Sequence, residues 1–367
     1  MLRGRRSALV FVLLIVSTLL YLLFHRRGVK TTASDGAKIA KVTVAVNSLS
    51  TNDAIARCLN SHAVQNSIHG YQHYILTKPL VQESGDTRNL PPGVWSKPAY
   101  ILHILLSELL KPEEERLSWL FWFDADTLVL NPHIRLETFL PPKLEESATS
   151  HIHLILGENW DGINNGAFLL RVHPWSISLL TAHFAFQTYH SDDWLPHREQ
   201  SAMSYLIHTA PEFVGNWTVV PFRWFNSFPV NGTYSVDIHE KHMDPSMLDN
   251  GESHVGDSAW KVVKGDMLVH FAGFGGSRDS WILPWADRAE QYLKDWSSPR
   301  YQNMLRVETG QFWEKWSAER RSKYAGPEDE RNQLQSMLEK WKSNYNEHLL
   351  RLSDFDKYEV VGLNLAA

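Results

Sequence analysis

Two carboxylates one residue apart, Asp124 and Asp126, interrupt an apolar stretch in the first half of the sequence. Residues 117–123 before them are apolar and rich in aromatic side chains, and residues 127–130 after them are again mostly apolar. Neighbouring carboxylates repel each other and raise each other's pKa unless a cation lies between them. Hard cations such as Mg²⁺ and Mn²⁺ take oxygen ligands and share them with substrate phosphates. The pair therefore predicts a metal site for a phosphorylated ligand, with an ordinary surface turn as the alternative.

The residues before the pair place it at the end of a buried strand. The apolar run at 117–123 has the composition of a strand that is covered on both faces, and open α/β sheets bind ligands at the carboxyl ends of their strands. An Asp-x-Asp in this place resembles the motif of glycosyltransferases with the GT-A fold, in which the carboxylates hold a metal on the nucleotide-sugar pyrophosphate.

Residues 123–127 also resemble the first motif of haloacid-dehalogenase-type phosphatases, in which the first Asp is a covalent nucleophile. That family needs a later Gly-Asp-x-x-x-Asp, and the nearest candidate is Gly265-Asp266. Four residues after Asp266 stands His270 instead of Asp. The motif also lies later in the chain than that family places it, so the phosphatase is the weaker reading.

The remaining pattern predicts an α/β fold built around a doubly wound sheet, because apolar strands and amphipathic helices alternate. Residues 159–166 are polar and rich in glycine, which favours a loop, and residues 239–260 are also expected to form a polar loop. We expect strands at 41–46, 71–76, 117–123, 151–156, 167–172 and 267–271, and helices at 53–66, 95–110, 174–186, 199–208 and from residue 285 onward.

The N-terminus predicts a membrane anchor. Residues 7–24 contain no charge and are almost wholly apolar, which is enough for a short membrane-spanning helix. Arginines precede the segment and basic residues follow it, whereas a cleaved signal peptide, the alternative, has a shorter apolar core. We therefore expect a cytosolic tail at 1–6, an anchor at 7–24 and a polar stem at 25–40. A catalytic domain at 41–300 and a helical C-terminal extension at 301–367 would follow.

Composition narrows the function further. The net charge of −5 gives no reason to expect a nucleic-acid partner. The single cysteine, Cys58, excludes a disulfide within the chain. Two acceptor sequons for N-glycosylation begin at Asn216 and Asn231, which supports a luminal location of the body.

Three later segments add polar groups to the acidic pair. The loop expected at 159–166 contains Asn164 between two glycines, and glycines let backbone N–H groups approach a ligand closely. Glu199 and Gln200 begin an expected helix, where polar side chains are common caps. His270 ends an expected strand and is followed by Gly273; a single His is usually structural, but His also binds Mn²⁺-like ions.

In their order along the chain these motifs resemble glycosyltransferase family 34, which includes fungal Golgi α-galactosyltransferases and mannosyltransferases and plant xyloglucan xylosyltransferases. The resemblance covers roughly residues 41–290. It implies a GT-A fold (a Rossmann-like open sheet flanked by helices), a single-pass type II Golgi membrane protein and retention of anomeric configuration. It also implies Mn²⁺ or Mg²⁺, a donor such as UDP-galactose or GDP-mannose, and a glycan acceptor that is N-linked, O-linked or part of a polysaccharide.

The resemblance assigns roles to residues by position. Asp124, Asp126 and His270 would hold the metal, and Gly273 would lie against the diphosphate. The other residues would contact the donor or the reacting sugars: Lys97 in a Trp-x-Lys helix, Asn164, Glu199 and Gln200, with Gln200 nearest the anomeric carbon. Plant members carry a diphosphate-binding Lys shortly after the His-Phe-x-Gly motif, and this sequence has none there. Arg278 or the glycine backbone would take its place.

Two questions stay open at this stage. A retaining transferase uses either a carboxylate nucleophile, for which Glu199 is the candidate in the later motifs, or attack on the same face as the leaving group. The alternative to an enzyme is a catalytically silent subunit of a Golgi glycosyltransferase complex, and association with other Golgi glycosyltransferases is expected in either case.

Overall fold

The computed structural model describes residues 37–46, 52–81, 94–142, 149–159, 162–190, 193, 195–229, 260–262, 265–274, 277–296 and 298–323. The expected tail and anchor, most of the stem, the loop at 239–259, the sequon at Asn231 and the chain after residue 323 lie outside these residues. Within the described part, no helix is both long enough and apolar enough to cross a membrane.

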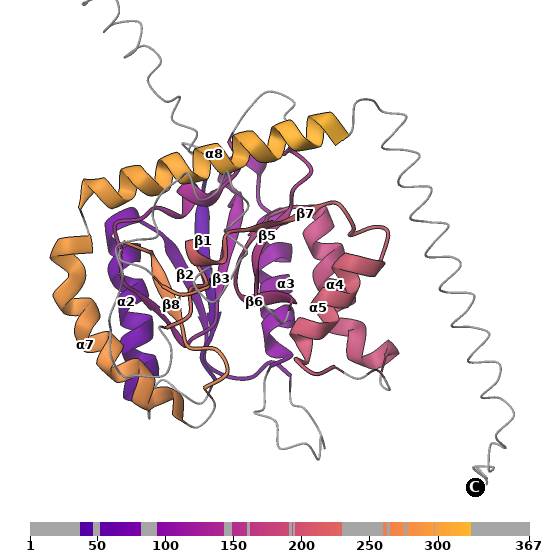
Figure 1. Ribbon diagram of the computed structural model, residues 1–367. Helices are drawn as coiled ribbons and strands as arrows, with labels where there is room; N and C mark the ends of the chain where they lie inside the picture. The colour runs from indigo at the N-terminus through magenta and orange to yellow at the C-terminus, as the bar shows by residue number, and fades with distance from the viewer. Residues whose placement is uncertain are drawn as a thin grey trace, which may run out of the picture.

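A six-stranded mixed sheet forms the centre of the fold, with strand order β2-β1-β3-β6-β5-β7 (Figure 1). Strand β1 pairs in parallel with both β2 and β3, whereas β6 runs antiparallel to both β3 and β5. A separate two-stranded antiparallel sheet joins β4 to β8. The strands are β1 (Ile39–Val44), β2 (Gln72–Leu76), β3 (Trp119–Phe123), β4 (Thr127–Val129), β5 (Leu154–Asn159), β6 (Gly162–Arg171), β7 (Trp217–Val220) and β8 (Leu268–His270).

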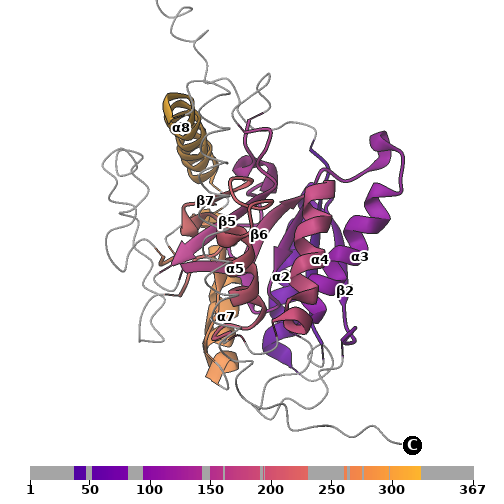
Figure 2. The ribbon, with the colours of Figure 1, turned by 90° about the vertical axis from the view of Figure 1, so that its right-hand side faces the viewer.

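Helices cover both faces of the large sheet (Figures 1 and 2). One side carries α2 and α7 together with the small sheet, and the other carries α3, α4 and α5. The α-helices are α2 (Asp53–His69), α3 (Ser96–Leu109), α4 (Pro174–Tyr189), α5 (Glu199–Thr209), α7 (Arg278–Trp296) and α8 (Pro299–Lys323). Short 3₁₀ turns are η1 (Glu113–Glu115), η2 (Leu136–Phe139) and η3 (Phe222–Trp224).

Strand β3 is buried on both faces, as its composition predicted. Its side chains alternate between two cores, with Phe121 and Phe123 packing toward α2 and α7, and Leu120 and Trp122 packing toward α3 and α4. Each fully buried large apolar side chain stabilises the fold by about 1.5–3 kcal/mol. Strand β3 is therefore a rigid base for the acidic pair that follows it.

The expectation of a loop at 159–166 is wrong. Residues 162–166 belong to β6, and β5 extends to Asn159, so two residues separate the antiparallel strands of a hairpin. The register of the hairpin shifts between Leu156 and Gly157. The doubly wound topology is also corrected, since β6 inserts antiparallel between β3 and β5.

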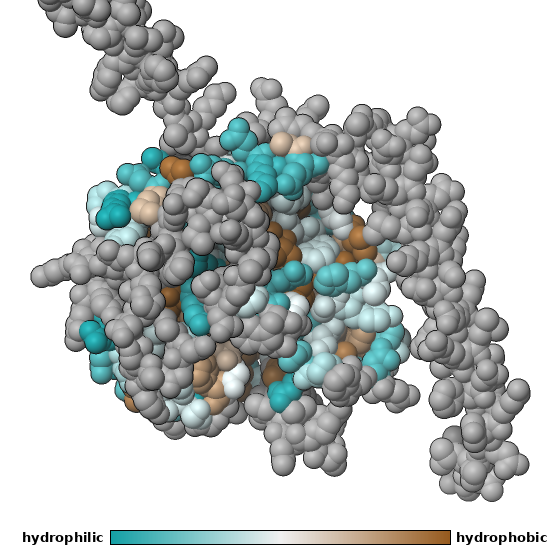
Figure 3. All heavy atoms as spheres, viewed as in Figure 1, coloured by the Kyte–Doolittle hydropathy of each residue, from teal (hydrophilic) through white to brown (hydrophobic). Residues whose placement is uncertain are grey.

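Helix α8 runs along one edge of the molecule, and its visible surface is mostly hydrophilic (Figure 3). Its Leu305 and Trp313 are buried in the same core as β3. The Trp313 indole donates to the carbonyl of Phe139, 3.3 Å away. Helix α7 begins earlier than the expected start at residue 285, and α8 spans the expected boundary at residue 300.

Candidate active site

The acidic pair lies in a tight turn between β3 and β4. The Asp124 N–H donates to the carbonyl of Gly166 on β6, 2.7 Å away. The Asp124 carbonyl accepts from the N–H and the hydroxyl of Thr127, at 3.1 and 2.9 Å. The Asp126 carbonyl accepts from the N–H of Phe271, just after β8, at 3.1 Å. The backbones of Asp124 and Asp126 are therefore held in place by hydrogen bonds to neighbouring segments.

His270 faces the two carboxylates from the end of β8. Its backbone lies opposite Thr127 in the small sheet, which brings the motifs together although more than 140 residues separate them. The Nε2 atom of His270 is 3.5 Å from Oδ1 of Asp126 and 3.9 Å from Oδ2 of Asp124. One ligand atom from each of the three residues lies within 4.8 Å of the others. The structure thus brings together all three residues that the sequence assigned to the metal.

A buried asparagine fixes the protonation of the imidazole. The Asn226 side chain donates through Nδ2 to Oδ1 of Asn164 at 2.9 Å, so its Oδ1 is left to accept. This Oδ1 lies 2.7 Å from Nδ1 of His270, which must therefore carry the proton. The lone pair on Nε2 then points to the carboxylates, as in a metal-ligating His held by an outer hydrogen bond. One imidazole nitrogen and two carboxylate oxygens are suitable ligand atoms for a divalent cation.

Gly166 is needed because His270 packs against it. A Cβ atom at this position would lie 2.1 Å from Cε1 of His270, far inside van der Waals contact. Asn164 holds the same place from the side, since its Oδ1 accepts from the N–H of Gly166 at 2.9 Å. The structure therefore gives Asn164 contacts that support His270. A sugar contact of Asn164 stays a prediction.

Lys97 connects the metal carboxylates to the start of α5. Its ammonium lies 3.3 Å from Oδ1 of Asp124 and 3.6 Å from Oε1 of Glu199. It also donates to the backbone and side-chain oxygens of Asn165, at 2.6 and 3.0 Å. The Trp122 ring lies beneath it at 4.9 Å, and the Trp122 indole donates to Asp124 at 2.9 Å. The ammonium of Lys97 thus lies between the carboxylates of Asp124 and Glu199 and interacts with both.

Glu199 and Gln200 are held at the N-terminus of α5. Burial raises the pKa of Glu199, Lys97 opposes this rise, and the charge of Asp124 adds to it. Gln200 accepts from the N–H of Asn165 at 3.0 Å. The residue before them, Arg198, has φ 54° and ψ −121°, which is a strained conformation for a side chain other than glycine. Such strain is typical of functional sites, where the surrounding structure maintains it.

Arg278 approaches the cluster from the first turn of α7. Its Nη1 lies 3.3 Å from Oδ2 of Asp126, and its buried Nε has no hydrogen-bond partner among the residues that the structure describes. Burial alone would raise the pKa of Asp126, but His270 in its protonated form and the charge of Arg278 lower it. Arg278 therefore borders the acidic pair. Gly273, three residues after His270, has φ 81°, and no atom of the other described residues, apart from its chain neighbours, lies within 4 Å of the position of a Cβ.

Asn226 is the site residue that sequence reasoning missed. It lies just after a 3₁₀ turn in a stretch without a recognisable motif. No local signal could have found it, because its role depends on contacts with Asn164 and His270. Asp266, the residue that a phosphatase would use, instead forms a buried ion pair with Arg223 at 2.7 Å.

Comparison with known proteins assigns the chain to a family. The family model described as "galactosyl transferase GMA12/MNN10 family" matches residues 42–279. The chain belongs to this family. The resemblance to glycosyltransferase family 34 is thereby confirmed. The matched range includes the acidic pair and the later residues Asn164, Glu199, Gln200 and His270.

The names of the matched relatives refer to different sugars. An uncharacterized alpha-1,2-galactosyltransferase of Schizosaccharomyces pombe is 25% identical, over 58% of this chain and 60% of its own length. A probable alpha-1,6-mannosyltransferase of Saccharomyces cerevisiae is 23% identical, over 45% and 43%. Xyloglucan 6-xylosyltransferase 2 of Arabidopsis thaliana is 26% identical, over 49% and 39%. The match thus spans at most about three fifths of these relatives.

One solved structure to which this chain is similar is that of a glycosyltransferase involved in the glycosylation of the major capsid of PBCV-1. It is 13% identical, with a TM-score of 0.42, over 66% of this chain and 98% of that protein.

Proposed function

We propose that this protein is a metal-dependent retaining glycosyltransferase that moves a hexose, galactose or mannose, from a nucleotide sugar to a glycan acceptor. The observation that carries the proposal is the cluster of Asp124, Asp126 and His270, in which a lone pair on Nε2 faces two carboxylates. Family membership supports the transfer of a sugar. The mixed sheet, with the acidic pair at the end of a central strand, supports the GT-A fold.

The cluster would hold Mn²⁺ or Mg²⁺, and a cation bound there supplies neutralisation of the charge that develops on the leaving nucleoside diphosphate. Arg278 adds a positive charge beside Asp126 that would attract a phosphate oxygen. The open space at Gly273 leaves room for the diphosphate. Arg278 would thus take the role of the Lys that plant members place after the His-Phe-x-Gly motif.

The sugar would lie on the α5 side of the cluster. Lys97 contacts both Asp124 and Glu199, so Glu199 lies near the metal carboxylates. A raised pKa of Glu199 is consistent with a buried carboxyl near a reacting centre. Glu199 would act as nucleophile in a double displacement. In same-face attack, Gln200 would instead contact the sugar beside the departing phosphate.

We also propose that the body is luminal in the Golgi and is anchored by residues 7–24, in association with other Golgi glycosyltransferases. The sequence pattern supports the anchor. The Asn216 amide donates to the carbonyl of His151 within the fold, so Asn231 is the better reporter of glycosylation. Removal of N-glycans should increase gel mobility, and Asn231→Gln should abolish most of that shift. Protease digestion of the body in intact microsomes would contradict this topology.

The activity is tested with a donor panel. Purified protein is incubated with Mn²⁺ and UDP-galactose, GDP-mannose or UDP-xylose, and released nucleotide is measured with and without oligosaccharide acceptors. We expect one hexose donor to release nucleotide at a rate that an acceptor increases. Release from none of the donors, in protein that binds Mn²⁺ and nucleotide, would instead favour a catalytically silent subunit.

A further inference from the structure

A buried lysine lies beneath the acidic turn. Lys41, on β1, has no exposed surface and forms no ion pair among the residues that the structure describes. Its amine lies 3.1 Å from Nδ1 of His62 and donates to Oε1 of Gln65, both on α2. Burial lowers the pKa of Lys41 well below its ordinary value. Burying a lysine without an ionic partner costs folding free energy. We therefore expect its hydrogen bonds to serve a function.

Hydrogen bonds continue from Lys41 to the metal site. The Thr127 hydroxyl donates to the Asp124 carbonyl at 2.9 Å and lies 2.9 Å from Nε2 of His62. In the tautomer of His62 that carries its proton on Nε2, this nitrogen donates to the Thr127 hydroxyl and Nδ1 accepts from Lys41. Lys41, His62, Thr127 and Asp124 thus form one continuous line of hydrogen bonds.

Thr127 is the residue where this chain meets both halves of the metal site. Its hydroxyl holds the Asp124 carbonyl, and its backbone lies opposite His270 in the small sheet. The His62 ring is itself fixed, because it stacks on Phe123 with ring centroids 3.6 Å apart and an angle of 7° between the planes. Phe123 is the residue directly before Asp124. A shift of His62 would therefore move the acidic turn.

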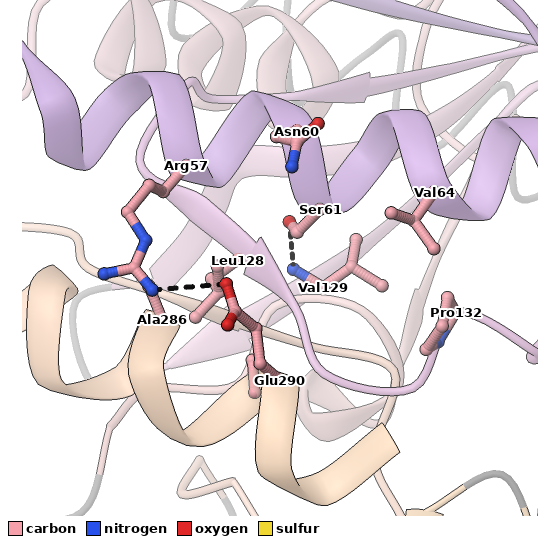
Figure 4. A pocket seen from close by; sticks show the side chains of 10 residues that line it. Arg57, Asn60, Ser61, Val64, Leu128, Val129, Pro132, Ala286 and Glu290 are labelled. Carbon is pink, nitrogen blue, oxygen red and sulfur yellow. Dashed lines mark hydrogen bonds and ion pairs between the residues drawn. The ribbon is translucent and has the colours of Figure 1, made fainter. Parts of the chain in front are cut away.

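Neighbouring side chains of α2 attach the helix to β4 in the same way. Ser61 accepts from the N–H of Val129 at 2.9 Å, at the edge of a pocket between α2, β4 and α7 (Figure 4). Arg57 reaches across this pocket to Glu290 on α7. Gln65 donates to the carbonyl of Ile134 at 2.7 Å. With β4 held at several points, a change at Lys41 acts on a turn that has few other ways to relax.

We propose that Lys41 is a positioning residue for the metal, which acts through His62 and Thr127 to keep the carboxylates of Asp124 and Asp126 aimed at His270. The inference rests on the metal site of the proposed function. It adds a contribution from β1 and α2, elements that carry none of the metal ligands. Partners in the outer shell of a metal site typically change affinity roughly tenfold to hundredfold.

The test is direct Mn²⁺ binding, measured from the loss of the free Mn²⁺ signal in electron paramagnetic resonance, with Mn²⁺ alone as the probe. Thr127→Val should weaken binding roughly tenfold, and Thr127→Ser, which keeps the hydroxyl, should bind within about twofold of the wild type. Lys41→Met should weaken binding about threefold or more in the wild-type background and have little effect in the Thr127→Val background. Thr43→Val is the matched control, because it removes a buried hydroxyl of β1 that has no hydrogen-bond partner in the described part of the chain.

If Lys41→Met folds poorly, His62→Phe removes both ring nitrogens while it keeps the stack on Phe123, and the same loss is expected. A purely structural role of Lys41 would weaken binding equally in both Thr127 backgrounds, which would overturn the inference. If the wild type binds Mn²⁺ and Lys41→Met binds it equally tightly, the inference is also overturned. Failure of the wild type to bind Mn²⁺ would instead contradict the metal site of the proposed function.

Discussion

Oδ1 of Asn226 lies 2.7 Å from Nδ1 of His270, and both side chains are buried. This contact fixes the tautomer that leaves Nε2 free to bind a cation. It also joins the loop after η3 to β8, and Asn226 in turn donates to Asn164 on β6. The orientation of the metal-facing imidazole thus depends on a residue that neither binds the metal nor belongs to a recognisable motif.

Asn226→Ala should therefore weaken Mn²⁺ binding roughly tenfold to hundredfold, as is typical when the outer partner of a metal-ligating His is lost. Nδ1 of His270 would lose its acceptor, and the ring could change tautomer or rotate. Mn²⁺ titration of the purified protein measures the effect. Asn60→Ala, at an exposed position of α2, is the control and should bind as the wild type does. Equal affinity of the Asn226 variant would show that Asn226 does not orient His270.

Gly166→Ala should displace the imidazole of His270, since the new Cβ would lie 2.1 Å from Cε1 in the present arrangement. We expect a loss of Mn²⁺ binding of about tenfold or more, by analogy with the loss of an outer-shell contact. Gly70→Ala is the contrast: its φ of 74° makes alanine strained, but no atom of the other described residues, apart from its chain neighbours, lies within 4 Å of the added Cβ. That variant should lower the melting temperature and leave Mn²⁺ binding unchanged. The reverse pattern would contradict the packing described for Gly166.

Glu199→Gln should lower turnover and raise thermal stability at neutral pH. The pKa of Glu199 is raised chiefly by burial, so its ionised form is unfavourable in the folded protein above that pKa. The folded state binds this proton more tightly than the unfolded state, and the neutral amide removes the cost of ionisation. If Glu199 is the nucleophile, turnover should fall by roughly a hundredfold or more. A variant with full activity would exclude Glu199 as nucleophile and favour same-face attack.

Acid should destabilise the protein through its buried histidines. Burial lowers the pKa to about 4 for His73 and to about 3 for His153 and His183. The unfolded chain, with values near 6.5, then binds protons first, so stability is present above about pH 6.5 and is lost as pH falls toward 4. Each fully buried imidazole contributes about 1.4 kcal/mol per unit of pKa difference. The melting temperature should therefore fall steeply below pH 6, and His183→Gln should flatten that fall. A fall of the same slope in the His183 variant would exclude His183 as a major contributor.

The metal ligands were predictable because each follows or ends an apolar strand. A buried strand that stops at Asp124, and another that stops at His270, mark the ends of strands, where α/β folds bind ligands. The direction of the strands was harder to predict. Antiparallel strands can be joined by a two-residue turn, whereas parallel strands need a longer crossover. The polar, glycine-rich composition of residues 159–166 favours a loop and so conceals the hairpin that makes β6 antiparallel.

The residues that orient the ligands could not be predicted from local pattern. Asn226, Lys41 and Gly166 act through contacts with residues far away in the sequence. A lysine within a strand of β-branched residues usually indicates a position that faces solvent, yet Lys41 is wholly buried. Gly166 was expected to admit a ligand, and the structure instead places the His270 ring against it. Such roles follow only from tertiary packing.

The measurement that tests the central claim most directly is donor cleavage as a function of Mn²⁺. We expect nucleotide release from the active hexose donor to stop in EDTA and to return with added Mn²⁺. Asp126→Asn should reduce this release more than roughly a hundredfold, without a large loss of thermal stability. Asp287→Asn, which neutralises an exposed carboxylate paired with Arg57, is the matched control and should remain active. Full activity in EDTA, or an Asp126→Asn variant as active as the Asp287→Asn control, would contradict the account.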